Sequence, residues 1–293
     1  MILKNLTNNK FFLLFFSGFL WGGSFIFMKK SLELFSFYEV AILRLIIAGL
    51  ILIPFSLEGL KKLSYKDKLY LMIPTFFGNG IPAFLFTYSQ QFINSNDAAI
   101  INSLTPIFTV LISLIIFKVK ESFYTFIGVI LGFIGTFLLS YKNSNNSTGN
   151  IFPYVLLIIA TLMYGFNTNF IKHKCAHINS NYIASLPYSF FIIFFPVLFY
   201  ENIYTKFFTT HFLYVLYLSF FCTSLPIILY YKLLKLVSAT FASYVTYIIP
   251  FFAFLWGLFF NENLTIVHFI SLVLVLSGVY LSSLKNKKND KTK

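Results

Sequence analysis

Long apolar runs separated by short polar segments dominate this 293-residue chain. Each run holds about 20 residues with few charges, the length that an α-helix needs to cross the hydrocarbon core of a bilayer. Ten runs can be read, at about residues 11–29, 38–56, 69–92, 98–117, 122–141, 151–171, 182–200, 212–231, 239–260 and 264–284. The pattern predicts an all-α integral membrane protein with ten transmembrane helices.

The first run could also act as a secretory signal peptide, because Lys4 and Lys10 precede it. Its apolar stretch, Phe11 to Met28, is longer than the hydrophobic region of a signal peptide and lacks a small-residue cleavage site. We therefore expect the run to be retained as the first transmembrane helix.

The basic residues predict an orientation. If the N-terminus is cytosolic and the runs alternate, most of the 22 Lys and Arg residues fall on the cytosolic side, as the positive-inside rule requires. The exceptions are Lys29, Lys30, Arg44, Lys142 and Lys206. We expect a protein of the bacterial cytoplasmic (inner) membrane, with the lipid bilayer as a partner and both termini cytosolic.

Composition supports the membrane class and narrows the partners. The chain is 58% hydrophobic and 11% charged, whereas about a quarter of the residues of a soluble domain are charged. The net charge of +13 does not predict a nucleic-acid partner, because the lysines lie in short loops between apolar runs. Cys175 and Cys222 lack a paired spacing, so neither a metal site nor a disulfide nor a cofactor is predicted.

The chain also repeats itself at an offset of 143–144 residues. Matching residues include Gly22 and Gly165, Lys29 and Lys172, Pro82 and Pro226, Ala98 and Ala242, Pro106 and Pro250, Phe108 and Phe252, Leu114 and Leu258, and Gly135 and Gly278. The polar segment 143–150 is the natural seam. We predict two five-helix repeats, residues 1–146 and residues 147–293, the second with a basic cytosolic tail.

Five helices per copy is an odd number, so the second copy must enter the membrane from the opposite side. Inverted repeats of this kind form alternating-access transporters, whose substrate site lies near the midplane where the copies meet. Duplication for packing alone is the less favoured alternative. The repeat therefore predicts a transporter.

Polar residues on otherwise apolar helices are the candidates for a substrate cavity, because an unpaired amide or hydroxyl is costly in hydrocarbon. For Asn102 and its repeat partner Thr246, cavity lining and interhelical hydrogen bonding are equally compatible with the sequence. Asn167, in a polar patch of the sixth run, is a better candidate than any Phe. The cavity candidates are Trp21, Asn79, Asn102, Thr105, Tyr164, Asn167, Tyr244 and Thr246.

Glycine and proline weaken a helix where its backbone bends or faces a cavity. The candidates for hinges or helix breaks are Gly78, Gly80, Pro82, Pro106, Pro226 and Pro250.

Arg44 is the only arginine and lies inside the second run, where a guanidinium needs a partner or water. It could hold an anionic substrate, or anchor its helix at the outer interface. Its place about two turns into the membrane favours the structural role. Glu39 is the one acidic residue near membrane depth, and His268 is interpreted as interfacial, so no proton carrier is apparent.

In their order these features resemble the EamA family of the drug/metabolite transporter superfamily, over nearly the whole chain. The resemblance rests on Leu20-Trp21-Gly22-Gly23-Ser24 followed by Lys29, on EVAILRLIIAGL (residues 39–50), and on Asp97-Ala98-Ala99, Thr105-Pro106, Glu121, Gly128, Gly132 and Gly135. It implies a ten-helix exporter or importer of amino acids and other small metabolites. It also implies a cavity lined by the first, third, fourth, sixth, eighth and ninth helices.

The chain departs from the family pattern before the fifth helix, where the family has a Gly-Glu turn. Here the sequence reads Lys118-Val119-Lys120-Glu121, with the acidic residue displaced, whereas the second copy has Asn261-Glu262. A special role for Glu121 is therefore not expected.

We predict a transporter and not an enzyme, with a small molecule as substrate and amino acids or related compounds as the class that the resemblance implies. The alternative is a polytopic membrane enzyme such as a lipid or isoprenoid transferase, which needs an acidic metal-binding cluster or a His/Asp pair near an interface. The sequence shows neither. A receptor or scaffold would not need an inverted repeat, and a homodimer is compatible with these features.

Overall fold

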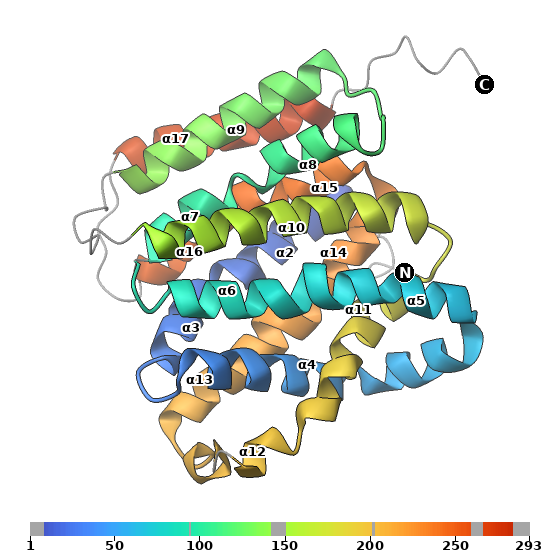
Figure 1. Cartoon of the computed structure of the whole chain (residues 1–293). Coiled ribbons are helices and arrows are strands. Elements are labelled where there is room, and N and C mark those ends of the chain that lie inside the picture. The colour runs from blue at the N-terminus through green and yellow to red at the C-terminus, as the bar shows by residue number, and fades with distance from the viewer. Residues whose placement is uncertain (1–8, 94, 142–150, 201–202, 259–265, 284–293) are drawn as a thin grey trace.

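The computed structural model describes residues 9–93, 95–141, 151–200, 203–258 and 266–283. Throughout these residues the regular elements are helices, so the predicted all-α class is confirmed (Figure 1). The predicted repeat boundary after residue 146, the Asn261-Glu262 turn and the basic tail lie outside the described residues, as does the side chain of His268.

The helices follow one another with short connections. In chain order they are α2 (Lys10–Gly22), α3 (Ser24–Ser31), α4 (Phe37–Lys62), α5 (Tyr65–Ile73), α6 (Ile81–Ser89), α7 (Ser95–Asn102), α8 (Thr105–Ile115), α9 (Phe123–Tyr141), α10 (Phe152–Lys174), α11 (Ser180–Ser189), α12 (Val197–Tyr200), α13 (Thr210–Ser219), α14 (Leu225–Leu236), α15 (Ala239–Ser243), α16 (Val245–Leu258) and α17 (Ile266–Ser283). The π-helical segments η1 (Pro74–Gly80) and η4 (Phe220–Ser224) join α5 to α6 and α13 to α14, and η2 (Phe190–Phe194) and η3 (Ile203–Lys206) are 3₁₀ turns.

Within the described part of the chain, five helical stretches are long and apolar enough to cross a bilayer. They cover residues 10–31, 37–62, 65–89, 152–174 and 210–236, and each coincides with a predicted run. The other predicted runs fall on helices that are interrupted or only partly described; α11, for example, contains Pro187 and continues as a 3₁₀ turn. Ten spans therefore stay a prediction.

Polar side chains at the ends of the apolar runs determine where helices begin. The Ser36 hydroxyl accepts a hydrogen bond from the backbone N–H of Glu39, and the Glu39 carboxylate accepts one from the backbone N–H of Ser36. This reciprocal capping box satisfies backbone donors at the start of α4. Thr209 and Ser238 cap α13 and α15 through their hydroxyls.

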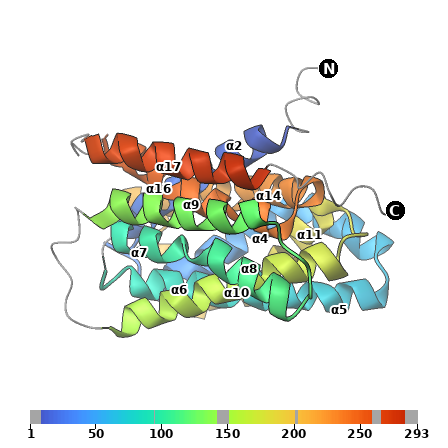
Figure 2. The same cartoon turned by 90° about the horizontal axis from the view of Figure 1, so that it is seen from above.

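The two halves pack against each other in a reciprocal way. Helix α9 runs along α17 at one edge of the molecule (Figures 1 and 2), and α4 packs along α11. Helix α2 packs on α14 and α16, while α10 packs on α6 and α8. The offset of 143–144 residues maps α2 onto α10, α6 onto α14 and α8 onto α16. The repeat in the sequence is therefore also a repeat in the packing.

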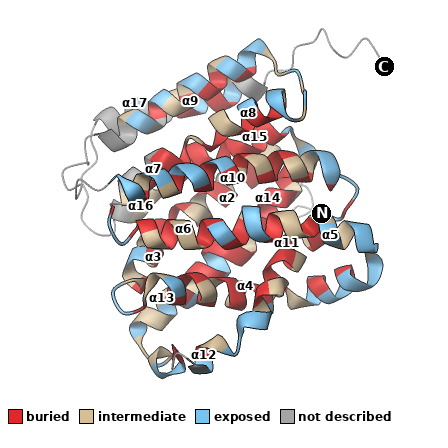
Figure 3. Cartoon of the chain, viewed as in Figure 1, coloured by how far each residue is buried: buried red, intermediate tan, exposed pale blue. Residues whose placement is uncertain are grey.

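Buried residues gather where these central helices meet, and apolar side chains remain exposed on the outside (Figure 3). On α9 and α10 the exposed apolar residues include Phe126, Ile130, Ile134, Ile158 and Leu162. An apolar outer surface is what the hydrocarbon of a bilayer requires.

Two equivalent glycines let helices of opposite halves approach closely. A Cβ on Gly22 of α2 would lie 2.6 Å from the Cβ of Phe252 and 2.9 Å from the backbone N of Ala253, both on α16. A Cβ on Gly165 of α10 would lie 3.0 Å from the backbone N of Thr109 on α8. Small residues at such contacts bring helix backbones together in membranes.

We expect Gly22→Ala and Gly165→Ala each to lower the melting temperature of the detergent-solubilised protein by several degrees. The added methyl group must move a neighbouring backbone, and overpacking of this kind costs about 1–3 kcal/mol. Gly23→Ala is the matched control, because a Cβ there meets side-chain atoms no closer than 3.3 Å. Equal melting temperatures for all three variants would contradict this assignment.

Candidate substrate cavity

A cavity of about 130 Å³ lies between the two halves. One water molecule occupies about 10–15 Å³ of such a cavity, so the space is large enough for a small molecule. Its lining residues are Trp21, Ser24, Phe25, Met28, Arg44, Gly78, Asn79, Phe86, Asn102, Thr105, Tyr164, Asn167, Thr168, Tyr188, Ile227, Tyr230, Tyr231, Ser243, Val245, Thr246 and Ile249. Both repeats therefore contribute to one site.

The structure brings all but one of the predicted cavity residues together. Those that line the cavity are Trp21, Asn79, Asn102, Thr105, Tyr164, Asn167 and Thr246. Tyr244 does not line it: its hydroxyl donates to the carbonyl of Thr125 at 3.4 Å, and its ring stacks on Tyr247. Tyr244 packs against α9 instead, because its side chain points away from the cavity. Whether the others touch a substrate stays a prediction.

Many lining residues form pairs related by the sequence repeat. The pairs are Trp21 and Tyr164, Ser24 and Asn167, Phe25 and Thr168, Arg44 and Tyr188, Phe86 and Tyr230, Asn102 and Thr246, and Thr105 and Ile249. The resemblance to known transporters did not include the second and seventh helices, which add Arg44 and Tyr188. The sequence repeat is the signal that could have identified Tyr188 and Tyr230, since they are the repeat equivalents of Arg44 and Phe86.

Aromatic contacts between the halves follow the same symmetry. The ring of Trp21 lies 5.3 Å from that of Tyr230, and the ring of Phe86 lies 5.9 Å from that of Tyr164. Each contact joins one repeat to the other across the cavity. Aromatic pairs at such distances stabilise beyond the area that they bury.

The two π-helical segments occupy equivalent places and contain or adjoin four of the hinge candidates. Gly78 and Gly80 lie in η1, which Pro82 follows, and Pro226 follows η4. The wider turns leave carbonyl groups that side chains reach. The amide of Asn79 donates to the carbonyl of Pro74 at 2.7 Å.

In η4 the hydroxyl of Thr223 donates to the carbonyl of Leu218 at 2.8 Å, the repeat-related bond. π-helical turns are frequent at functional sites. Hinge motion at these turns stays a prediction.

The two other proline candidates differ from each other. Pro106 lies in the first turn of α8, where its missing N–H costs little, after the interruption between α7 and α8. Pro250 lies inside α16. Pro106 therefore begins α8 directly after the break between α7 and α8, and a hinge at either proline stays a prediction.

Asn167 lines the cavity, and part of its amide lacks a hydrogen-bond partner among the described residues. Its Nδ2 lies 3.5 Å from the hydroxyl of Tyr231, and its Oδ1 has no hydrogen-bond partner among the described residues. A Cβ on Gly78 would collide with this amide. The amide nitrogen of the neighbouring Asn169 donates to the carbonyl of Thr109 at 2.8 Å, and its Oδ1 also lacks a partner among the described residues, but Asn169 does not line the cavity.

Arg44 lines the cavity and reaches from α4 to η4 in the other half. Its Nε donates to the hydroxyl of Thr223 at 2.6 Å, and its Nη2 lies 3.4 Å from the carbonyl of Cys222. These contacts place Arg44 between the repeats, and its predicted position at the outer interface stays a prediction.

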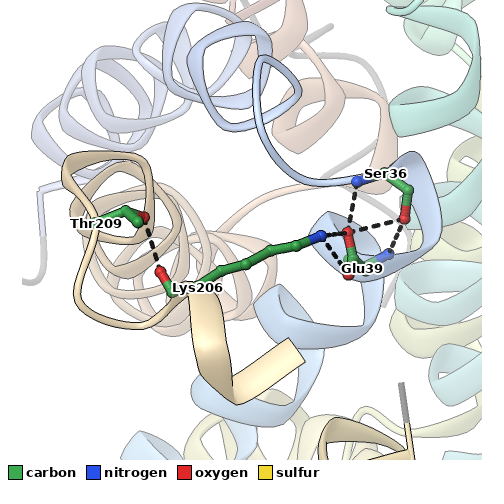
Figure 4. Close-up of polar contacts among 4 residues, drawn as sticks. All are labelled: Ser36, Glu39, Lys206 and Thr209. Carbon is green, nitrogen blue, oxygen red and sulfur yellow. Dashed lines mark hydrogen bonds and ion pairs between the residues drawn. The ribbon is translucent and has the colours of Figure 1, made fainter. Parts of the chain in front are cut away.

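Glu39, the acidic residue nearest to Arg44 in the sequence, belongs to a different interaction. Both of its carboxylate oxygens lie 2.8 Å from Nζ of Lys206, which reaches over from η3 (Figure 4). The Glu39 side chain is 4% exposed, and that of Lys206 is 31% exposed. The pair joins α4 to the second half, and the capping box with Ser36 holds the carboxylate in place.

We expect Lys206→Met to lower the stability of the protein, because it leaves the buried Glu39 carboxylate without its cation. Removing one partner of a buried pair costs about 3–5 kcal/mol, and the partial exposure of Lys206 places this case below that range. The double variant Lys206→Met with Glu39→Gln should recover part of the loss. Thermal unfolding measures both, and an unchanged melting temperature for Lys206→Met would contradict the assignment.

Comparison with known proteins gives a consistent result. The family model described as "EamA-like transporter family" matches residues 9–141 and again residues 151–284. The chain is 26% identical over 280 residues to "Uncharacterized transporter YetK" of Bacillus subtilis (strain 168), covering 92% of this chain and 85% of that protein.

A second relative is an "Uncharacterized transporter in trpA 3'region" of Buchnera aphidicola subsp. Schlechtendalia chinensis, which is 25% identical over 250 residues, with 81% and 82% covered. A solved structure titled "Crystal structure of protein" superposes with a TM-score of 0.71 at 15% identity, over 92% of this chain and 95% of that one. At this identity the match shows a shared fold.

Proposed function

Because this chain belongs to the EamA-like transporter family, with two copies of the family domain, we propose that it moves a small metabolite across a membrane by alternating access. The family and the transporter names of its relatives favour a transporter over the membrane transferase considered as the alternative. The cavity between the halves is the proposed substrate site. The site residues are those predicted residues that line it.

The observation that carries this proposal is the pairing of lining residues across the repeat. Asn102 and Thr246 are equivalent positions in the two repeats, as are Trp21 and Tyr164, and the helices that carry them pack reciprocally. Transporters built from inverted repeats bind their substrate at the repeat interface and expose it to either side by rocking one half against the other. An inverted pair of five-helix units, ten spans in all, accounts for this arrangement.

The proposed substrate class is amino acids or related compounds, as the resemblance implies. The cavity volume suits a small molecule, and its lining combines aromatic rings with amide and hydroxyl groups. A site with a largely apolar wall and a few placed polar groups is typical of small-ligand recognition.

We expect Asn167→Leu and Asn102→Leu to reduce uptake of the transported compound into proteoliposomes by roughly tenfold each, since each variant loses a polar group that lines the cavity. Leu162→Ala, on the exposed face of the same helix as Asn167, is the matched control and should transport normally. A panel of labelled amino acids and related metabolites identifies the compound. Unchanged uptake by both Asn variants would remove these residues from the site.

The proposal also places the protein in the inner membrane with both termini cytosolic, which cysteine labelling tests. Positions 61 and 204 are repeat-related and exposed, so Lys61→Cys and Tyr204→Cys should react from opposite sides with a membrane-impermeant maleimide. Tyr204→Cys should label on intact cells, and Lys61→Cys only after permeabilisation. Labelling of both from one side would contradict the inverted arrangement.

The native cysteines give little background in this experiment. Cys175 and Cys222 are buried, and burial raises the pKa of the Cys175 thiol to about 11. The reactive form is the thiolate, which is scarce near neutral pH when the pKa is this high.

A further inference from the structure

The charge of the cavity points to the chemistry of its ligand. Among the residues that line it, Arg44 is the only charged side chain, so the described wall carries one positive charge and no negative one. A guanidinium at membrane depth requires a partner or water. We propose that the cavity selects organic anions, with Arg44 binding the carboxylate or an equivalent anionic group of the ligand; this inference rests on the proposed function.

The two acidic residues that precede Arg44 in the sequence are paired with other groups. Glu39 binds Lys206 through both oxygens and caps α4 (Figure 4). Glu33 lies with Lys30 at 2.7 Å, and this contact lowers the pKa of the Glu33 carboxyl. Among the described residues no carboxylate lies within 4 Å of the guanidinium. The protein therefore leaves the Arg44 charge to be balanced from inside the cavity.

The hydrogen bonds of Arg44 also leave one end of its guanidinium open. Of its five N–H donors, that on Nε is taken by Thr223 and one on Nη2 lies near the carbonyl of Cys222. Both N–H groups of Nη1 and the second one of Nη2 lack a partner in the described part of the chain. Nη1 and Nη2 together form the planar fork that binds a carboxylate through two parallel hydrogen bonds.

The bond to Thr223 fixes this fork before any ligand arrives. The hydroxyl of Thr223 accepts from Arg44 and donates to the carbonyl of Leu218, so the π-helical turn η4 holds it in one orientation. A side chain held in advance loses less conformational freedom on binding. Because η4 belongs to the second half, the anion site joins α4 of one half to the hinge candidate region of the other.

The remaining lining favours an apolar or aromatic body on the anion. The rings of Trp21, Tyr164, Tyr188 and Tyr230 form much of the wall. A free ammonium group would find only neutral acceptors such as Oδ1 of Asn167, which lacks a partner. Charge complementarity therefore favours a monocarboxylate, disfavours an amine, and leaves a zwitterion as a weaker ligand.

Arg44 could instead serve only to hold the two halves together. Ligands that differ in charge distinguish this structural role from anion binding. The probes are benzoate and isovalerate, their neutral amides and the corresponding amines benzylamine and isoamylamine, with phenylalanine as a zwitterion. Each is added at equal ionic strength to the purified full-length protein. The readouts are the shift in melting temperature and the Kd from isothermal titration, since a ligand stabilises the state that it binds.

We expect the acids to bind at least about tenfold more tightly than their amides, because charge-assisted bidentate hydrogen bonds are stronger than neutral ones. Arg44→Gln should abolish this preference and Arg44→Lys should keep part of it. Thr223→Val should lower the melting temperature and weaken acid binding while keeping part of the preference, because the fork is no longer held in advance. Lys61→Gln removes an exposed charge elsewhere and should change neither.

Several results would overturn the inference. These are a preference for amines or amides in the unmodified protein, a preference for acids that survives Arg44→Gln, or no binding of either acid up to about 10 mM, where even a millimolar site fills. If Arg44→Gln fails to fold, the unmodified protein and Arg44→Lys still decide between acid and amine.

The failure of this inference differs from failure of the proposed function. Flux of neutral or cationic compounds in proteoliposomes, without binding of the acids, would keep the transporter and end the anion assignment. Binding of the acids without flux of any compound class would keep the anion site and end the transport proposal.

Discussion

The approach of α2 to α16 at Gly22, repeated by the approach of α10 to α8 at Gly165, is the contact on which the arrangement depends. In hydrocarbon there is little hydrophobic force between helices, so close backbone packing through small residues largely determines which helices associate. These two contacts bring the first helix of each half against the opposite half. The cavity is the space left between them, and its symmetry follows from theirs.

Polar groups at membrane depth need hydrogen-bond or charge partners, and this need limits where they can lie. Glu39 is satisfied by Lys206, and the amide nitrogen of Asn169 donates to the carbonyl of Thr109, while Oδ1 of Asn169 has no partner among the described residues. Asn167 and Arg44 keep donors or acceptors that no described residue takes, and both line the cavity. Neither burial nor an unfilled hydrogen bond separates these residues by itself; Asn167 and Arg44 differ from Asn169 and Glu39 because they line the cavity.

Repeat-related positions need not do the same work. By the repeat offset, Tyr188 is equivalent to Arg44 and Thr223 is equivalent to Asn79. The two halves therefore have a similar backbone, but only the first half contributes a charge at this position. The π-helical turns keep equivalent side-chain bonds to backbone carbonyls in both halves. Only in η4 does the hydroxyl that makes this bond also hold a guanidinium. The two halves therefore share the bonds that satisfy backbone groups, whereas the charge in the cavity comes from one half alone.

The all-α class, the duplication and seven of the 21 lining residues follow from the sequence, because apolar run length, polar residues within apolar runs and a fixed repeat offset are local or periodic properties. The direction in which a side chain points is not a local or periodic property of the sequence. Tyr244 and Tyr188 are both aromatic residues on apolar helices, yet Tyr244 packs on α9 and Tyr188 faces the cavity. The pairing of Glu39 with Lys206, 167 residues apart, likewise needed the fold. Tertiary contacts decided these cases, since helix rotation and long-range partners are set by packing between the halves.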